Sequence, residues 1–433
     1  MRPTLRLRPH RGTTAHVASL YPFSVQGALG HRGPYLGVDL LAGGAEFCWD
    51  PFESYAAGTV TNPNCWILGE PGNGKSALVK SLLWRMAAIY GTGGQGRWIA
   101  IADPKGEYAP LAELLGLHVV RLAPGGTTRV NPLADGPGAD DEPDDRRTLR
   151  RAEMVTALVA TVLDRPLTQL EDAAIYATVD HLGRSPATPT LTDLARLLTD
   201  PPDDVVRTLR RPAVEVLPEL TALTYAVDKL LARSLRGMFD GPSTVPPKWD
   251  GPGIVLDLSA IPIDSDALPL VMVAAAGWLS QLMVGPGPRR VQVLDEAWAL
   301  LGNRHTARYL QSCFKLGRTY GVANICIAHR PSDLGAQADD GTSTAKIAGG
   351  LLADAATKIL LRQAPDQLDG ATTSFGLTDP ERQIVGQLTR GRALWKVAGR
   401  TAVVHHMLGR ADTALCDTDA RMAGSSVGQP VAA

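Results

Sequence analysis

The feature that most constrains this chain is a glycine-rich loop between an apolar run and a helical pattern. The loop GEPGNGKS occupies 69–76 and fits the spacing GxxxxGK[ST]. A strand-like run, CWIL, precedes it, and a segment of helical periodicity follows at 75–90. Glycines let backbone N–H groups turn toward one point, and the helix that follows adds its positive N-terminal end. The order strand, loop, helix therefore predicts a cradle for phosphate oxygens rather than a chance glycine turn.

The residue types in this P-loop, or Walker A, pattern have separate expected tasks. We expect Lys75 to reach the β- and γ-phosphates of ATP and the Ser76 hydroxyl to bind Mg²⁺. The candidate nucleotide-binding residues are Gly69, Glu70, Pro71, Gly72, Asn73, Gly74, Lys75, Ser76 and Ala77.

An apolar strand that ends in two acids supplies the expected second half of the site. VQVLDE occupies 291–296, and a strand that ends in Asp-Glu is common when it stands alone. Paired with the loop, it predicts that Asp295 holds Mg²⁺ through water and that Glu296 polarises the attacking water. The adjacent glutamate favours hydrolysis of the nucleotide over binding alone.

Short strand-like runs alternate with helical patterns along most of the chain. The runs are continuously apolar, which is typical of a parallel sheet covered on both faces. Helical patterns at 75–90, 267–284 and 305–320 fit between them. We therefore predict an α/β fold with a doubly wound, mostly parallel sheet. The predicted strands are CWILG, RWIAIAD, GIVLDLS, VQVLDE, ANICIAH and TKILLRQ.

The region 146–240 differs because it has helical patterns and no strand-like run. In RRAEMVTALVATVL, Val155, Leu158 and Val159 share one helix face. Stretches rich in proline and glycine flank the region, which predicts an all-helical insertion. The predicted divisions are a lead-in and strand region at 1–50, the first part of the core at 51–145, the insertion at 146–240, the second part of the core at 241–411 and a disordered tail at 412–433.

One uncharged segment, 267–284, just reaches the length of a membrane span. Pro269, Ser280 and Gln281 interrupt it and a strand-like run follows, so we expect a buried core helix instead. The five cysteines lack CxxC spacing, which favours a reducing cytoplasm and argues against zinc. The net charge of −1 creates no overall field for nucleic acid or an anionic membrane, so any such binding needs a local patch.

Polar residues follow two further predicted strands. Asp103, Lys105 and Glu107 come after RWIAIAD and would lie at the carboxyl edge of the sheet, where ligands bind in such folds. A polar turn with a helix cap is an equally good interpretation. His329 ends ANICIAH at the same edge, as a sensor of the γ-phosphate or as a structural histidine.

The helix predicted over 304–320 has one basic and one apolar face. The basic face is either solvated, or it meets a neighbouring subunit's γ-phosphate with Arg318 as an arginine finger. The basic face comprises Arg304, Arg308, Gln311, Lys315 and Arg318, and the apolar face comprises Tyr309, Leu310, Cys313, Phe314, Leu316 and Tyr320.

These motifs together resemble the TraC-like ATPases of type IV secretion and conjugation, within the HerA/FtsK group of P-loop motors. The resemblance extends over about 35–410 and includes GEPGNGKS, DPKGEY, LDEAW, KLGRTYGV and the closing RGRALWKVAGRTAVVHHML. It implies a RecA-like core and a ring of six subunits with ATP between neighbours. Such motors power substrate transfer or machine assembly, with membrane-associated secretion or conjugation proteins as partners at the inner face of the membrane.

The same resemblance implies a role for each matching residue. Lys75 and Ser76 bind nucleotide and Mg²⁺, Asp295 and Glu296 run hydrolysis, and Arg318 acts in trans. The group often has glutamine where this chain has His329.

Two other functions fit the motifs. A DNA translocase or coupling protein of the same group would need basic loops, for which RTLRRP at 207–212 and RSLR at 233–236 are candidates. A nucleotide-gated scaffold would bind ATP and hydrolyse it poorly, and Glu296 argues against that function.

Overall fold

The computed structural model describes residues 29–92, 96–135, 142–185, 187–232, 235–245, 251–282, 287–301, 304–330 and 343–416. One large sheet has the strand order β2-β1-β11-β10-β9-β3-β8-β7-β4-β6-β5. Its strands are β1 (Tyr35–Asp39), β2 (Ala45–Cys48), β3 (Cys65–Leu68), β4 (Arg97–Asp103), β5 (His118–Arg121), β6 (Gly253–Asp257), β7 (Arg289–Leu294), β8 (Val322–Ala328), β9 (Thr357–Leu360), β10 (Arg392–Val397) and β11 (Arg400–His406).

The sheet is parallel from β9 to β5 and antiparallel from β2 to β9. All six strands predicted from the sequence are present, as β3, β4, β6, β7, β8 and β9. The parallel edge strand β5 was not predicted. Of its four residues only Val120 is buried, so its sequence lacks the continuous apolar run that marks the others.

Helices cover both faces of the parallel part, which gives each strand two buried sides. Along β3, Trp66 and Leu68 join the core with α11 (Ala267–Leu282) and α13 (Arg304–Tyr320). Cys65 and Ile67 point the other way and join the core with α3 (Lys75–Tyr90), α4 (Ala109–Leu115) and α18 (Arg410–Cys416). The continuous apolar runs follow from this double coverage.

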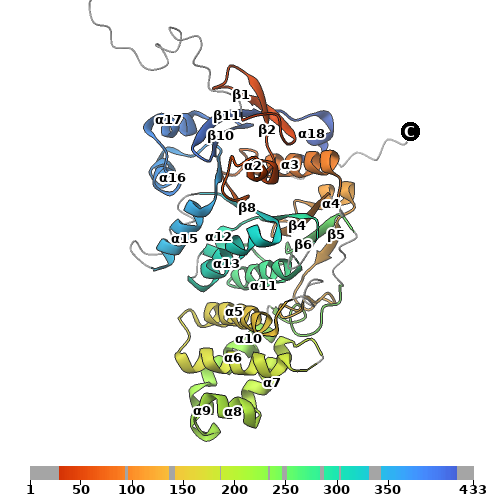
Figure 1. Cartoon of the computed structure of the whole chain (residues 1–433), viewed down its shortest axis with the longest axis vertical. Coiled ribbons are helices and arrows are strands. Elements are labelled where there is room, and N and C mark those ends of the chain that lie inside the picture. The colour runs from red at the N-terminus through yellow and green to blue at the C-terminus, as the bar shows by residue number, and fades with distance from the viewer. Residues whose placement is uncertain are drawn as a thin grey trace, which may run out of the picture.

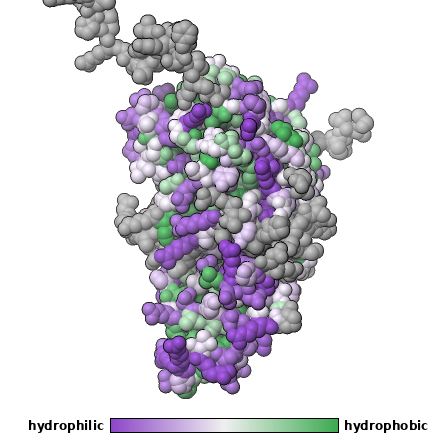
Figure 2. Space-filling view, in the orientation of Figure 1, coloured by the Kyte–Doolittle hydropathy of each residue, from purple (hydrophilic) through white to green (hydrophobic). Residues whose placement is uncertain are grey.

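The segment from 142 to 232 contains helices and no strand among its described residues. They are α5 (Asp144–Leu163), α6 (Gln169–Gly183), α7 (Leu191–Thr199), α8 (Asp203–Leu209), α9 (Ala213–Glu219) and α10 (Thr221–Leu231). They form the end of the molecule opposite β1 and β2 (Figure 1). On the face shown in Figure 2, hydrophilic residues predominate at that end, and hydrophobic residues are scattered.

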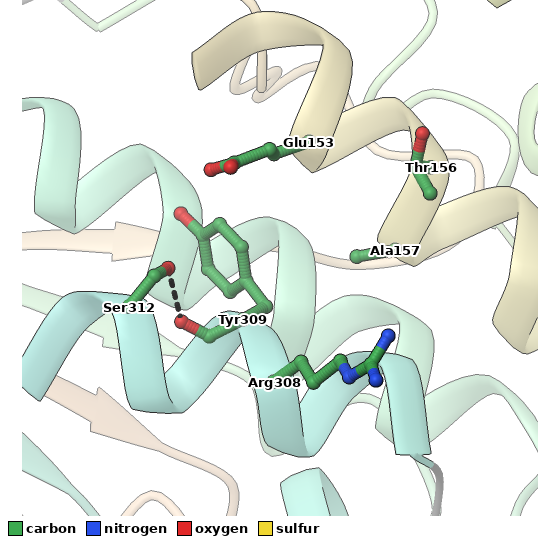
Figure 3. Close-up of a pocket in the computed structure, with 6 residues that line it drawn as sticks. All are labelled: Glu153, Thr156, Ala157, Arg308, Tyr309 and Ser312. Carbon is green, nitrogen blue, oxygen red and sulfur yellow. Dashed lines mark hydrogen bonds between the residues drawn. The ribbon is translucent and has the colours of Figure 1, made fainter. Parts of the chain in front are cut away.

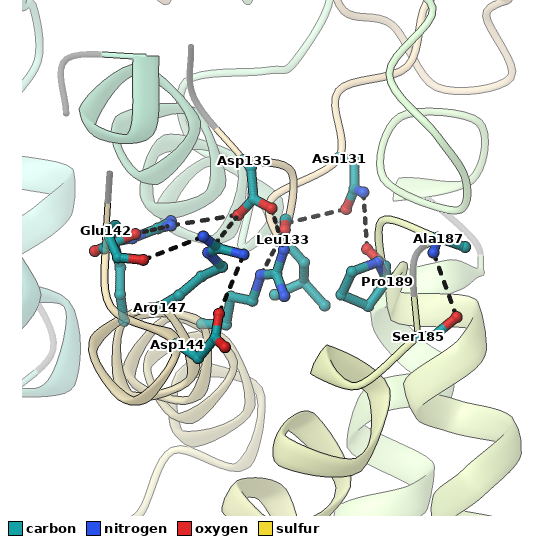
Figure 4. Close-up of polar contacts among 11 residues, drawn as sticks. Asn131, Leu133, Asp135, Glu142, Asp144, Arg147, Ser185, Ala187 and Pro189 are labelled. Atoms are coloured by element: carbon teal, nitrogen blue, oxygen red, sulfur yellow. Dashed lines mark hydrogen bonds and ion pairs between the residues drawn. The ribbon is translucent and has the colours of Figure 1, made fainter. Parts of the chain in front are cut away.

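The helix α5 joins these helices to the core. It packs against α11 and α13, and at Gly277 of α11 the approach is so close that a Cβ would lie 1.6 Å from Met154 Cε. Polar contacts fix the same junction (Figure 4). Asp135 accepts a hydrogen bond from Arg151 of α5 at 2.7 Å, and Asn131 donates to Pro189 O at 2.9 Å.

The uncharged segment near 267–284 forms α11, and the residues from Ala267 to Leu279 of this helix, apart from the half-buried Pro269, are buried in the core as predicted. Pro269 lies in the first turn, where its missing N–H costs no hydrogen bond. Among the residues that the structure describes, no helix has both the length and the hydrophobicity to span a membrane.

The chain's remaining described helices lie around the sheet. They are α2 (Pro51–Ala56), α12 (Trp298–Leu301), α15 (Ser343–Asp354), α16 (Leu368–Phe375) and α17 (Asp379–Gln387). The predicted disorder of 412–433 is wrong for 412–416, because α18 packs Leu415 into the core beside α3. Residues 417–433 lie outside the described part of the chain.

Candidate active site

The predicted phosphate loop joins the end of β3 to the start of α3. Gly72 and Gly74 have φ angles of 78° and 99°, a region that favours glycine. Gly69 is required for another reason, since a Cβ there would lie 2.7 Å from Leu361 Cβ. Local geometry therefore explains why the loop is rich in glycine.

Glu70 anchors this loop to the chain that follows β9. Its backbone N–H donates to Arg362 O at 3.4 Å, and its Oε1 accepts from Ala364 N at 3.2 Å. Glu70 was predicted as a nucleotide-binding residue, and its side chain here positions the loop.

Lys75 is buried at the first position of α3, and its amine donates to three acceptors. They are Gly69 O, Glu70 O at 3.1 Å and His329 Nδ1 at 2.8 Å. Burial and the nearby Lys105 ammonium lower the pKa of Lys75 to about 8. The amine is thus held close to the loop, at the mouth of the expected phosphate cradle.

Asp295 and Glu296 follow β7 directly, as the sequence predicts. The Asp295 N–H donates to Ala102 O at 3.3 Å, which ties the end of β7 to β4. Burial, reinforced by the Glu296 charge, raises the pKa of Asp295 to about 7. Glu296 has a φ of 53°, an uncommon value for a non-glycine residue that costs roughly 1–3 kcal/mol and is characteristic of functional sites.

The Glu296 carboxylate is surrounded by donors. Oε1 contacts Lys105 Nζ and lies 2.7 Å from His329 Nε2, and Oε2 accepts from the Trp298 indole N–H. Burial alone would raise the pKa of Glu296. The hydrogen bond from His329, together with the Lys105 charge, outweighs burial and lowers that pKa to about 2.

The DPKGEY segment was interpreted either as part of a ligand site or as a polar turn with a helix cap. Each interpretation applies to different residues. Asp103 is buried and caps the turn, because its carboxylate accepts from the N–H groups of Lys105, Glu107 and Tyr108 at 3.3, 3.1 and 2.9 Å. Lys105 and Glu107 instead face the site, where both line the cavity described next.

A cavity of about 160 Å³ lies against the phosphate loop and brings together residues from distant parts of the chain. It includes both expected Mg²⁺ ligands, Ser76 and Asp295, whose hydroxyl and carboxylate oxygens suit that hard cation. The lining residues are Pro71, Gly72, Gly74, Lys75, Ser76, Ala77, Lys105, Glu107, Asp295, His329, Arg390 and Cys416.

Sequence reasoning missed Arg390 and Cys416. Arg390 begins the closing RGRALWKVAGRTAVVHHML segment just before β10, and Cys416 ends α18; both are far from the loop in sequence, and neither was singled out as a site residue. Arg318 lies on α13. The description of this part of the chain does not extend to its side chain.

The amphipathic pattern predicted for α13 is confirmed where its side chains are described. Leu310 and Phe314 are buried, and Arg308 and Lys315 are exposed. Arg308 lines a second cavity, of about 190 Å³, between α13 and α5 (Figure 3). Its described lining residues are all different from those of the cavity at the phosphate loop.

No protein-family model matches the sequence, and no curated protein matches it either. Solved structures do match. VirB4 of Thermoanaerobacter pseudethanolicus has a TM-score of 0.70 at 22% identity, over 90% of this chain and 100% of that chain. The fold is that of VirB4. The predicted RecA-like fold of the conjugation and secretion ATPases is thereby confirmed at the level of the fold.

The bacterial conjugative coupling protein TrwB shares this VirB4-like fold more distantly. Its unbound form, TrwBdeltaN70, has a TM-score of 0.55 at 16% identity, over 88% of this chain and 90% of that chain. TrwB in complex with the ATP analogue ADPNP has the same TM-score and identity, over 95% of this chain and 96% of that chain. A further TrwB structure contains ADP and Mg²⁺.

Proposed function

We propose that this chain is an ATP-hydrolysing motor of a conjugation or type IV secretion-like system, which powers substrate transfer or machine assembly. One observation carries the proposal: Lys75, Ser76 and Asp295 line a single cavity at the phosphate loop. Glu296 adjoins Asp295 in sequence and is bound to His329, which lines the same cavity. The VirB4-like fold and the nucleotide complexes of TrwB support it.

Each residue has a distinct role in this proposal. Lys75 neutralises charge on the β- and γ-phosphates, and the loop N–H groups orient them. Ser76 and Asp295 hold Mg²⁺, which neutralises charge that develops on the phosphate oxygens. Glu296 accepts the proton of the attacking water, and His329 senses the γ-phosphate.

We propose a homo-hexamer in which Arg318 reaches the γ-phosphate held by the neighbouring subunit. Its membrane-associated partners would place the ring in the cytoplasm at the inner face of the membrane. The helices within 146–240 form an inserted domain in this proposal, flanked by core parts at 51–145 and 241–411. The packing of α5 on α11 and α13 supports a rigid connection between the inserted domain and the core.

A DNA translocase or coupling protein is the second candidate function, because the TrwB fold covers almost the whole chain. Its predicted basic loops give it less support. Arg211 in the segment 207–212 is paired with Glu219 at 2.6 Å, and residues 233–234 lie outside the described part of the chain.

Steady-state ATPase activity, measured with and without DNA alongside the solution mass, tests the proposal. A secretion motor should show Mg²⁺-dependent turnover that increases with assembly and does not require DNA. A coupling protein should instead show DNA-stimulated turnover and DNA binding that falls steeply with salt. Turnover per subunit that stays constant on dilution to the monomer would contradict the ring.

Substitution of Arg318 by alanine tests the neighbouring-subunit contact. It should lower turnover by about 10³-fold or more in the assembled protein and leave nucleotide binding to one subunit intact. Full activity of the Arg318→Ala ring would rule out that role.

A further inference from the structure

The hydrogen bonds of Lys75 show that its amine is fully engaged within the protein. An ammonium group has three N–H donors. In this structure the donors reach three acceptors, Gly69 O, Glu70 O and His329 Nδ1. Lys75 can therefore bind a phosphate oxygen only by giving up one of these acceptors.

The contact with Lys75 fixes the hydrogen position on His329. Because an ammonium group only donates, His329 Nδ1 must accept. The Glu296 carboxylate only accepts, so Nε2 carries the hydrogen of the neutral ring and donates to Oε1 at 2.7 Å; the Lys105 ammonium, 3.0 Å from Nε2, does not donate to it. Lys75, His329 and Glu296 thus form one continuous chain of hydrogen bonds from the phosphate loop to the end of β7.

Lys105 completes the set of donors around Glu296. Its ammonium contacts Glu296 Oε1, the oxygen that His329 also approaches, and lies 3.0 Å from His329 Nε2. Trp298 occupies the other oxygen. With two donors on Oε1 and the indole on Oε2, most acceptor positions that a water molecule would need are taken.

We propose that Lys105 restrains Glu296 in the nucleotide-free chain and that a bound triphosphate releases it through Lys75 and His329. When Lys75 exchanges His329 for a phosphate oxygen, the ring loses the partner that orients it. Glu296 then loses the hydrogen bond from His329 Nε2. Lys105 gains a nearby phosphate anion as an alternative partner. This inference rests on the proposed function, and it makes Lys105 a positioning residue.

The exposure of the two side chains makes the restraint testable without unfolding the site. Lys105 is 26% exposed, whereas Glu296 is 2% exposed. Replacement of Lys105 by methionine keeps the aliphatic stem and removes the ammonium. Glu296 loses a cation in this variant but keeps hydrogen bonds from His329 and Trp298, and Lys105→Arg keeps the cation should Lys105→Met fold poorly.

The first experiment compares ATP turnover in wild type, Lys105→Met and Lys105→Arg. We expect Lys105→Met to raise kcat about three- to tenfold, the equivalent of one net hydrogen bond, with KM changed less than about twofold. Lys105→Arg retains a cation and should give an intermediate kcat. The matched control is Lys229→Met on α10, an exposed lysine outside the site, which should match wild type.

The second experiment follows Trp298 and needs no turnover. The fluorescence of Trp298 is obtained by subtracting the emission of the same protein that carries Trp298→Phe. In wild type this fluorescence should change when ADPNP is added. Lys105→Met should show much of this change before nucleotide is added.

The outcomes separate the two proposals. A kcat lower in Lys105→Met than in wild type would mean that Lys105 takes part in the chemistry and would overturn the restraint. Unchanged kcat and unchanged Trp298 emission would overturn it too. Absence of nucleotide binding and turnover in wild type would instead overturn the proposed function itself.

Discussion

The two ends of β4 and β7 both carry charged residues, yet they are built differently. The strands begin at Arg97 and Arg289, and they lead at their other ends into Asp103 and Asp295. At the beginning, each arginine is paired with carboxylates and lies over aromatic rings. At the other end, groups of like charge lie side by side around a cavity.

The charged groups at the beginning of the strands form ion pairs that hold the structure together. Arg97 is buried and approaches Asp50 at 3.3 Å and Glu53 at 3.6 Å. Its guanidinium lies 4.0 Å from the centre of the Tyr90 ring. Arg289 completes the pairing with Glu53 at 3.1 Å. Burial raises the pKa of Asp50, although the Arg97 charge and two backbone N–H groups oppose that change.

The end of the strands gathers ionisable groups around a cavity. Burial and the Lys105 charge lower the pKa of Lys75, and the two adjacent carboxyl groups have pKa values displaced in opposite directions, to about 7 for Asp295 and about 2 for Glu296. Strongly displaced pKa values in groups that lie beside a cavity are typical of functional sites. The difference teaches that buried pairs away from a cavity stabilise a fold, whereas ionisable groups gathered around a cavity are placed to meet a ligand.

The largest effect is expected from Glu296→Gln at the cavity end. Loss of the general base should lower kcat by about 10²–10⁴-fold while ATP still binds, because the phosphate loop is untouched. Single-turnover hydrolysis and equilibrium binding measure the two quantities. Unchanged turnover would remove Glu296 from the proposed role.

The next effect is expected from Arg97→Met at the paired end. The substitution leaves Asp50 buried beside a neutral side chain, which should lower the free energy of unfolding by about 3 kcal/mol. Nucleotide affinity of the folded protein should match wild type. Chemical denaturation and calorimetric binding test this, and a large loss of affinity would show that the two ends are not independent.

A smaller effect is expected from pH. The pKa of Asp295 is raised to about 7 in the folded chain, so its carboxyl group is protonated below that pH, although Mg²⁺ needs the carboxylate. The gain in ADP affinity given by Mg²⁺ should therefore increase as pH rises from 6 to 8, and decrease about tenfold per pH unit well below 7. In Asp295→Asn the gain should lose this pH dependence, apart from the part that comes from the ADP phosphate itself, whose second pKa is about 6. A wild-type gain independent of pH would contradict the raised pKa.

The smallest effect is expected from Arg382→Ala, which removes an exposed ion pair. Arg382 meets Asp369 at 2.7 Å, and Asp369 is 86% exposed. The free energy of unfolding should change by less than about 1 kcal/mol. A loss as large as that of Arg97→Met would show that burial is not what distinguishes the paired end.

Local motifs allowed much of this site to be predicted. Glycines with positive φ, a strand before the loop and a helix after it place Lys75 and Ser76 without knowledge of the rest of the chain. Asp295 and Glu296 could be added because parallel strands end at one edge of the sheet. These predictions depend on only a few residues near each motif.

The remaining features depend on contacts between distant segments. Arg390 and Cys416 reach the cavity because β10 pairs with β9 and α18 packs beside α3, and no local pattern encodes that arrangement. The contact between Lys105 and Glu296 joins the ends of two strands that are almost 200 residues apart in sequence. Sequence reasoning placed both residues at the same edge and could not show that they touch.

Titration calorimetry of wild type and Lys75→Met with ADPNP and Mg²⁺ tests the central claim most directly. The loop should bind the Mg²⁺-nucleotide in wild type, and loss of the lysine should weaken binding about 100-fold, as expected when a charged hydrogen bond to phosphate is removed. Equal affinity in the two proteins, or no binding in either, would contradict a nucleotide site at the carboxyl edge of this sheet.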